Sequence, residues 1–188
     1  MTAIKVKGAA ILARQTFVRD EYGEGAWTKI LQNMSAEDRA ELEGTILAST
    51  WHPFEFNDRL DSAIVEVLGE GSKEIFESIG RASARQNLEG PHRAFAARRD
   101  PAWFLSATDR IYGFYYDKGY RTYEETGPNS GVITTFDAET FSQTDCLTVI
   151  GWYKEALLMC GASDVEMVEE ACRANGDPVC RYRISWKD

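Results

Sequence analysis

The sequence predicts an α+β fold in which a helical N-terminal half caps a four-stranded antiparallel sheet crossed by one helix. Apolar residues recur at helical spacing through residues 1–118, and β-rich segments follow in residues 119–188. One apolar helical pattern separates two pairs of those segments. The order of helices, strand, strand, helix, strand, strand is typical of an α+β architecture. Because no linker or internal repeat interrupts this order, we expect one domain over residues 1–188.

The first helices follow from apolar periodicity and from capping residues. Residues 4–7 predict a short strand or an extended lead-in. The run Tyr22-Gly23-Glu24-Gly25 interrupts the helical pattern that follows. Ser35, with Asp38 three residues later, indicates an N-terminal cap, because the serine side chain can accept a hydrogen bond from the backbone of Asp38. We therefore expect helices over residues 8–19, from residue 26, and over residues 36–42.

Four more helical segments precede the sheet. Asn57 is placed to cap a helix over residues 58–68, since asparagine is favoured at this position. Asp100 followed by Pro101 is a strong helix start, because proline fits the first helical turn. The helix that it opens should end before Gly119. The other two segments run from residue 71 to residue 87 and around His92 and Phe95.

Two strands, a helix and a hairpin make up the C-terminal part. Residues 120–126 and 132–136 are β-rich and flank a glycine-containing turn. A helix with a strong apolar pattern begins after Asp145 and ends at Gly161. Asn175-Gly176-Asp177-Pro178 is a turn signal, because asparagine and glycine tolerate positive φ and proline fixes its own. The last hairpin therefore has strands over residues 165–172 and 179–186.

Composition and charge narrow the function classes. The chain has 188 residues, of which 44% are hydrophobic, and its formal net charge is −9. This surplus of acidic residues argues against nucleic-acid binding, which needs a basic face. No run approaches the length of a membrane span, and the N-terminal residues lack the apolar core of a signal peptide. We therefore expect a cytoplasmic protein with no nucleic-acid or membrane partner.

The cysteines form the first candidate site. In the reducing cytoplasm, clustered cysteines indicate metal or redox chemistry more often than disulfides. The final hairpin should bring Cys172 and Cys180 together near its turn. The other interpretation is that these two are buried in the sheet as small apolar residues, as free cysteines often are. All four cysteines lie in the last third of the chain: Cys146, Cys160, Cys172 and Cys180.

The segment around the cysteines resembles the 4-vinyl reductase domain. That small-ligand-binding module also forms the sensor of activators that respond to phenols and toluenes. The resemblance is carried by residues 146–152, by Glu169-Glu170-Ala171-Cys172 and by Gly176-Asp177-Pro178-Val179-Cys180. It implies a structural zinc site, for which thiolates and a carboxylate are suitable ligands. The implied zinc ligands are Cys146, Glu169, Cys172 and Cys180.

Strand geometry places one condition on that zinc site. Residues three apart on a regular strand point to opposite faces, so the side chains of Glu169 and Cys172 would diverge. Either a bulge or bend lies between them, or Glu170 takes the place of Glu169. Cys160 fits no ligand spacing, and we expect it in the core.

The N-terminal half is similar to heme-nitric oxide/oxygen binding domains. The similarity lies in Val6-Lys7-Gly8 and in residues 22–27. The whole chain most resembles an uncharacterised, largely myxobacterial family that combines both sets of features. We do not expect heme, because the Tyr-x-Ser-x-Arg motif that holds the propionates in the heme-binding family is absent. Neither His52 nor His92 occupies a position that the family uses for the axial ligand.

A set of aromatic residues forms the second candidate site. A pocket between the long helix, the middle strands and the crossing helix would be apolar with few polar groups, as small-molecule sites usually are. The alternative is that each of these aromatic residues belongs to an ordinary core, since aromatic residues at helical spacing usually do. We expect a small apolar molecule to bind against Trp103, Tyr112, Phe136 and Trp152.

These features favour a non-catalytic sensor or adaptor domain. The sequence has no nucleophile-base-acid set and no phosphate-cradling glycine loop. Ligand binding would change the helical cap or a dimer surface, so we expect a homodimer or a signalling partner, with Phe17 and Trp27 at the contact. Two alternatives stay open. One is an enzyme that acts on a vinyl or tetrapyrrole group with an outside reductant, and the other is a structural interaction protein with a filled core.

Overall fold

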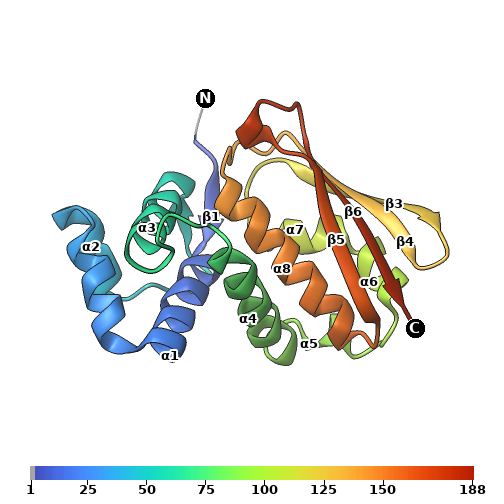
Figure 1. Cartoon of the computed structure of the whole chain (residues 1–188), viewed down its shortest axis with the longest axis horizontal. Helices are drawn as coiled ribbons and strands as arrows, with labels where there is room; N and C mark the ends of the chain where they lie inside the picture. The colour runs from blue at the N-terminus through green and yellow to red at the C-terminus, as the bar shows by residue number, and fades with distance from the viewer. Residues whose placement is uncertain (1–2) are drawn as a thin grey trace.

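A four-stranded antiparallel sheet forms the C-terminal part of the protein. The computed structural model describes residues 3–188 (Figure 1). The strands are arranged in the order β3-β4-β6-β5, and every neighbouring pair is antiparallel. The α+β fold class predicted from the sequence is therefore confirmed. The strands are β3 (Tyr120–Gly127), β4 (Ser130–Phe136), β5 (Ser163–Ala171) and β6 (Cys180–Lys187).

One face of the sheet packs into the core and the other faces solvent. In β6 the side chains of Cys180, Tyr182 and Ile184 are buried, while those of Arg181 and Arg183 between them are exposed. This alternation follows from the two-residue period of a strand. Helix α8 (Gln143–Met159) crosses on the buried side and shares its hydrophobic core with the sheet (Figure 1). The sheet and α8 therefore form two packed layers.

The N-terminal helices build a second core beside the first. Helices α1 (Gly8–Gln32), α2 (Ala36–Glu43) and α3 (Phe54–Leu68) lie on the side of α4 and α8 that faces away from the sheet (Figure 1). Phe17 and Trp27 are 9% and 1% exposed and belong to this core, so the expectation that they form a dimer contact is wrong. None of the described helices is both long and apolar enough to cross a membrane.

Local signals in the N-terminal half had mixed outcomes. The predicted break near Tyr22 is confirmed: at Gly23, where φ is 79° and ψ is 171°, the backbone is not helical, and α1 consists of two helical stretches joined at this kink. Ser35 caps α2 as predicted, with its hydroxyl accepting a hydrogen bond from the Asp38 backbone N–H. Asn57 does not cap α3, because the helix already begins at Phe54 and the Asn57 amide donates to Asp61 inside it. The predicted lead-in forms the short strand β1 (Lys5–Lys7), which pairs with β2 (Trp51–Pro53).

The predicted long helix after Pro101 is two short helices. Asp100 accepts a hydrogen bond from the Trp103 backbone N–H and starts α6 (Pro101–Ser106), as the sequence indicates. A turn at Ala107 then ends α6 and starts α7 (Thr108–Tyr112). The hydroxyls of Thr108 and Tyr153 of α8 hydrogen-bond to each other, and this tertiary contact fixes the new direction of the chain. Before them lies the short helix α5 (Arg93–Ala96).

Helices α4 (Ile75–Glu89) and α8 touch through their backbones. Gly80 of α4 lies against the carbonyl of Thr148, and Gly151 of α8 lies against the carbonyl of Glu77. A side-chain carbon at either glycine would overlap these carbonyl oxygens. Such close packing is possible because glycine has no Cβ. This contact joins the two cores of the protein.

Replacing Gly151 by alanine tests the importance of this contact. The added methyl would push α4 away from α8, and overpacking of this kind typically costs about 1–3 kcal/mol of unfolding free energy. Gly25→Ala is the matched control, because Gly25 also lies in a helix but has no atom within contact distance of an added Cβ. We expect urea denaturation to show a loss for Gly151→Ala and no loss for Gly25→Ala. Equal stabilities of the two variants would contradict the packing argument.

Candidate functional site

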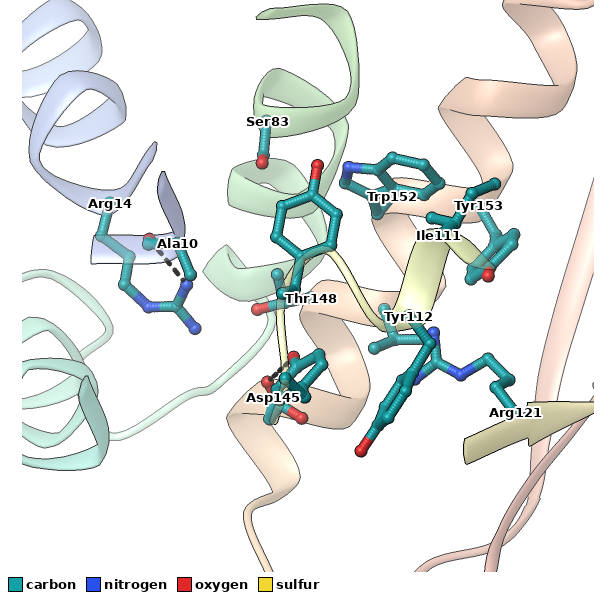
Figure 2. Close-up of a pocket in the computed structure, with 13 residues that line it drawn as sticks. Ala10, Arg14, Ser83, Ile111, Tyr112, Arg121, Asp145, Thr148, Trp152 and Tyr153 are labelled. Carbon is teal, nitrogen blue, oxygen red and sulfur yellow. Dashed lines mark hydrogen bonds between the residues drawn. The ribbon is translucent and has the colours of Figure 1, made fainter. Parts of the chain in front are cut away.

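A cavity of about 50 Å³ lies where the two cores meet (Figure 2). Its walls come from α1, α4, α7 with the residues just after it, β3 and α8. Elements from both halves of the chain therefore enclose one space. The lining residues are Ala10, Arg14, Ser83, Ile111, Tyr112, Tyr115, Tyr116, Arg121, Asp145, Thr148, Val149, Trp152 and Tyr153.

One wall of the cavity is aromatic. The rings of Tyr112 and Tyr116 stack with their centroids 4.8 Å apart, and Tyr115 meets Trp152 edge to face at 6.2 Å. The hydroxyl of Tyr115 and the indole N–H of Trp152 are buried and face each other, and neither makes a hydrogen bond of ordinary geometry with any described residue. Burial also raises the pKa of Tyr115. Unpartnered buried polar groups are unfavourable, so this wall offers hydrogen-bonding groups to a molecule in the cavity.

A buried ion pair lies at the side of the cavity nearest α1. Arg14 is 2% exposed, and its guanidinium binds both carboxylate oxygens of Asp61 in α3. Thr144, at the start of α8, donates its hydroxyl hydrogen to Asp61 over 2.9 Å. The Asn57 amide completes the set of donors around the carboxylate. Each charge of this pair is therefore neutralised and hydrogen-bonded, as buried charges need to be.

Two further charged groups line the cavity without such a partner. Arg121 is 6% exposed, and its Nε donates to the Thr135 hydroxyl over 2.8 Å. Asp145 accepts a hydrogen bond of 2.6 Å from the Tyr116 hydroxyl, and burial raises the pKa of its carboxyl. Among the residues that the structure describes, neither Arg121 nor Asp145 forms an ion pair with any side chain.

The four aromatic residues proposed from the sequence fall into two groups. Tyr112 and Trp152 line the cavity. Trp103 and Phe136 lie outside the cavity. The Cζ atom of Arg98 is 4.6 Å from the ring centroid of Trp103. The ring of Phe136 stacks on that of Tyr120 with 5.0 Å between centroids. The structure thus brings together only half of that set. Ligand binding by Tyr112 and Trp152 stays a prediction.

Sequence reasoning missed the polar part of the cavity. Arg14 occupies a position on the apolar stripe of α1, three residues after Ile11 and four before Val18. A charged residue on a buried stripe predicts a buried partner of opposite charge, because charged side chains are rarely buried unless they are paired. No comparable signal marks Arg121, because alternating polar residues are normal in a strand.

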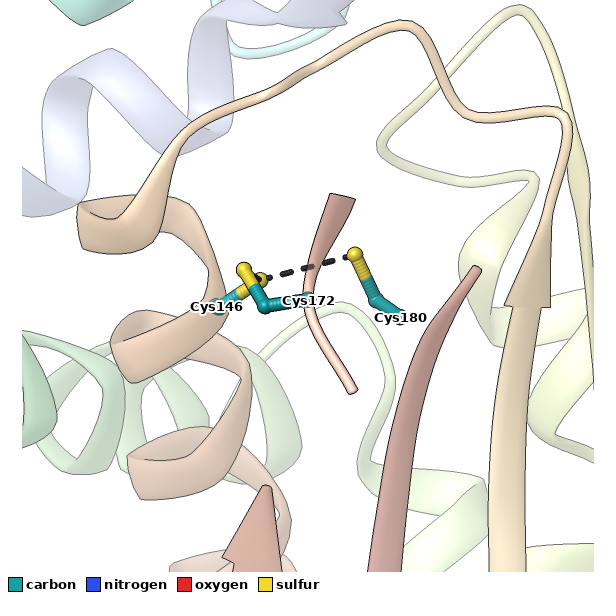
Figure 3. Close-up of side chains that lie close together, drawn as sticks. All are labelled: Cys146, Cys172 and Cys180. Atoms are coloured by element: carbon teal, nitrogen blue, oxygen red, sulfur yellow. Dashed lines mark hydrogen bonds between the residues drawn. The ribbon is translucent and has the colours of Figure 1, made fainter. Parts of the chain in front are cut away.

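Three cysteine sulfurs lie together beside the start of α8 (Figure 3). The Sγ atom of Cys146 is 3.5 Å from that of Cys172 and 3.6 Å from that of Cys180. All three atoms lie within 4.8 Å of one another, and all three residues are buried. Cys160 is also buried, at the C-terminal end of α8, as expected for a core residue.

Glu169 and Cys172 can point to the same face of the sheet only if β5 is irregular between them, and β5 has a bulge there. Glu169 pairs with Tyr182 and Ala171 pairs with Arg181, so β5 carries one extra residue between them. Glu170 then points to the exposed face, where it forms ion pairs with Arg181 and Arg183. Glu169 shares the buried face with Tyr182, and its carboxylate oxygen Oε1 is buried without a hydrogen-bond partner. The carboxylate that faces the thiols is therefore that of Glu169, although it lies outside the group of three sulfurs.

Hydrogen bonds favour the thiolate form of two of these cysteines. The Cys146 thiol lowers the pKa of Cys180 to about 7, and the Arg173 backbone N–H, 3.4 Å from that sulfur, acts in the same direction. The Cys146 thiol and the backbone N–H of Ala174 also lower the pKa of Cys172. Thiolates, unlike thiols, are metal ligands and nucleophiles. The cluster therefore has the chemistry of a soft-metal site.

The cavity residues do not fit a heme group. A macrocycle of that size needs a pocket of about 300 Å³ or more, whereas this cavity measures about 50 Å³. Neither histidine lines it: His52 pairs with Glu41, and His92 stacks on Phe114. Tyr112 donates its hydroxyl hydrogen to the Lys118 carbonyl, and burial raises its pKa, so it is not poised as a phenolate ligand.

Comparison with known proteins gives a likeness in fold. No protein-family model and no curated protein sequence matches the chain. Solved structures of H-NOX proteins match over nearly the whole length. The structure of Fe(II) unliganded H-NOX from K. algicida has a TM-score of 0.74 at 14% identity, covering 97% of both chains.

Two structures from S. oneidensis show the same likeness. An H-NOX protein in the Fe(II)NO ligation state has a TM-score of 0.75 at 10% identity, and an H-NOX domain in the Fe(II)CO ligation state has 0.73 at 11%. Each alignment covers 97% of this chain and 99% of the other. The resemblance to the 4-vinyl reductase domain and to the largely myxobacterial family receives no support from these comparisons. At such low identity the likeness concerns architecture, and the chain has the fold of the H-NOX domains.

Proposed function

We propose that this protein is a non-catalytic sensor or adaptor domain that binds a small molecule in the cavity between its helices and its sheet. The observation that carries the proposal is the position of the cavity, which is enclosed jointly by the N-terminal core and the sheet core. Its buried Tyr115 hydroxyl and Trp152 indole N–H, which make no hydrogen bond of ordinary geometry with a described residue, support the presence of a ligand there. The likeness in fold to H-NOX proteins solved with NO and CO is consistent with such a role.

A ligand in the cavity would contact both the N-terminal helices and the part of the protein that contains the sheet. A ligand would touch Arg14 of α1 on one side and Trp152 of α8 on the other. A molecule that contacts both sides stabilises the arrangement of the two cores that it fits best. A partner that recognises the helical surface would then distinguish the filled from the empty state. The partner is a signalling protein or a second copy of the chain, in the cytoplasm.

Substitution of Trp152 tests ligand binding at this place. The cavity has room for about three or four water molecules, so xenon and propanol are suitable small apolar probes. We expect both to change the tryptophan fluorescence of the wild-type protein. Trp152→Phe should reduce the response at least tenfold, because it removes the indole that lines the cavity and reports its occupancy. Trp103→Phe is the matched control, since Trp103 lies outside the cavity, and it should keep the response.

Native mass spectrometry of the purified protein supplies an independent readout. A ligand retained from the cell would appear as additional mass on the folded chain and would be absent from Trp152→Phe. The proposal is wrong if no additional mass is retained and the two tryptophan variants respond equally to xenon and propanol.

We also infer a structural zinc site at the cysteine cluster. Two sulfurs bound to zinc at about 2.3 Å in a tetrahedron are about 3.8 Å apart. The measured separations of 3.5 and 3.6 Å from Cys146 are close to this value. Glu169 would complete the ligand set, and its unpartnered buried oxygen supports that role. Zinc bound there would join the start of α8 to the β5-β6 hairpin.

Metal analysis of single variants tests the zinc proposal. We expect one zinc per chain in the wild-type protein and none in Cys172→Ala, while Cys160→Ala keeps its metal because Cys160 lies elsewhere in the core. Glu169→Gln should weaken zinc binding about 10- to 100-fold, as loss of a ligand or its support does. Glu170→Gln is the matched control, since Glu170 faces solvent. A chelator should lower the melting temperature of the wild-type protein, and zinc-free wild-type protein would refute the site.

The enzyme alternative receives no support from the cavity. A tetrapyrrole requires several times the volume available, and the lining residues of the cavity offer no nucleotide site for a reductant. The same size argument applies to heme. Incubation of the protein with hemin should therefore give no Soret band of a bound, axially ligated heme.

A further inference from the structure

Two arginines line the cavity, and only one of them is neutralised. Arg14 binds the Asp61 carboxylate through two nitrogens and the Ala10 carbonyl through a third. The buried guanidinium of Arg14 therefore has both a counter-ion and hydrogen-bond acceptors. Arg121 is also buried, at 6% exposed, but its guanidinium has only neutral partners, the hydroxyls of Thr135 and Tyr153, and forms no ion pair among the described residues.

Arg121 forms no ion pair with a described residue, although it attracts the Asp145 carboxyl and opposes the rise in pKa that burial causes there. Its guanidinium lies over the ring of Tyr112 at 4.9 Å and near the ring of Tyr153 at 5.6 Å. Aromatic faces attract a cation but do not neutralise it. Asp145 lines the same cavity, yet it forms no ion pair with Arg121 and is held by the Tyr116 hydroxyl (Figure 2). An arginine does not lose its proton, so it stays charged in this buried position.

We propose that Arg121 binds the carboxylate of a small anionic ligand in this cavity. The inference rests on the proposed function and specifies the chemical class of its ligand. A carboxylate matches the planar fork of a guanidinium, and the pair is strong where water is excluded. With a cavity of about 50 Å³, the ligand has no more than about five non-hydrogen atoms. Its apolar end packs against the aromatic wall that contains Trp152.

The proposed ligand carries a charge at one end, in addition to the apolar part expected from the sequence. The aromatic residues chosen from the sequence describe one wall of the cavity, and Arg121 supplies the charge opposite in sign to the ligand. Because Tyr112 and Tyr153 flank the guanidinium, its orientation is fixed before any ligand arrives. A site that is already ordered loses less conformational freedom on binding.

Acetate and acetamide provide the decisive comparison, because they have the same shape and differ in charge. Binding to the wild-type protein is followed by Trp152-dependent fluorescence and by calorimetry, at constant ionic strength set with sodium chloride. We expect acetate to bind at least tenfold more tightly than acetamide. Equal affinity for the two, or an acetate response that chloride reproduces, would overturn the proposal.

Variants of Arg121 identify the group responsible. Arg121→Gln should weaken acetate binding at least tenfold, whereas Arg121→Lys, which keeps the charge, should retain a measurable part of it. Acetate affinity unchanged in Arg121→Gln would also overturn the proposal. If Arg121→Gln fails to fold, the comparison of acetate with acetamide in the wild-type protein still decides.

The two proposals can fail separately. Binding of xenon and propanol that depends on Trp152, without discrimination between acetate and acetamide, would leave the sensor proposal standing and refute the role of Arg121. The absence of any response to xenon, propanol and acetate would refute both.

Discussion

The backbone contact between α4 and α8 sets the position of the groups that these two helices contribute to the candidate site. Gly80 and Gly151 let the two helices approach until carbonyl oxygens of each helix lie against the other. At that distance Ser83 of α4 and Thr148 and Trp152 of α8 enclose one cavity rather than facing separate surfaces. Larger residues at the two glycines would separate the helices and open this cavity. The site is therefore a product of close packing, as are most protein interiors.

A buried polar network complements that contact. Asp61 joins Arg14 of α1, its own helix α3 and Thr144 at the start of α8. Breaking a buried pair leaves an uncompensated charge, so such a network tolerates few alternative arrangements. It lies between the N-terminal core and the residues that precede Cys146. The start of α8 is thus held on one side by the ion pair and on the other by its thiol contacts.

Much of the architecture could be predicted from the sequence, because local patterns determine it. The alternation of Cys180, Tyr182 and Ile184 with exposed arginines identifies β6, and the Asp100-Pro101 signal marks a helix start that the structure confirms. The break at Ala107 could not be predicted, because it accompanies a hydrogen bond between the hydroxyls of Thr108 and Tyr153, which lies in a distant helix. Tertiary contacts of this kind leave no trace in local periodicity.

The candidate site was predictable only where adjacent residues carry it. The hairpin turn predicts that Cys172 and Cys180 lie together, whereas Cys146 is implied only by the resemblance to the 4-vinyl reductase domain. Strand geometry predicts a bulge or bend if Glu169 is to face the cysteines, and β5 has the bulge. The environment of Arg121 arises from α7, β4 and α8 together, so no single segment reveals it. Trp103 and Phe136 resemble Tyr112 and Trp152 in type and spacing, and only the packed structure distinguishes them.

The bulge in β5 also affects how the protein meets other molecules. β5 is an edge strand, and an edge with a regular row of free backbone groups invites another strand to pair with it. The extra residue between Glu169 and Ala171 breaks that row, and the exposed side chains of Glu166 and Glu170 place negative charge beside it. The edge is therefore poorly suited to sheet extension or aggregation.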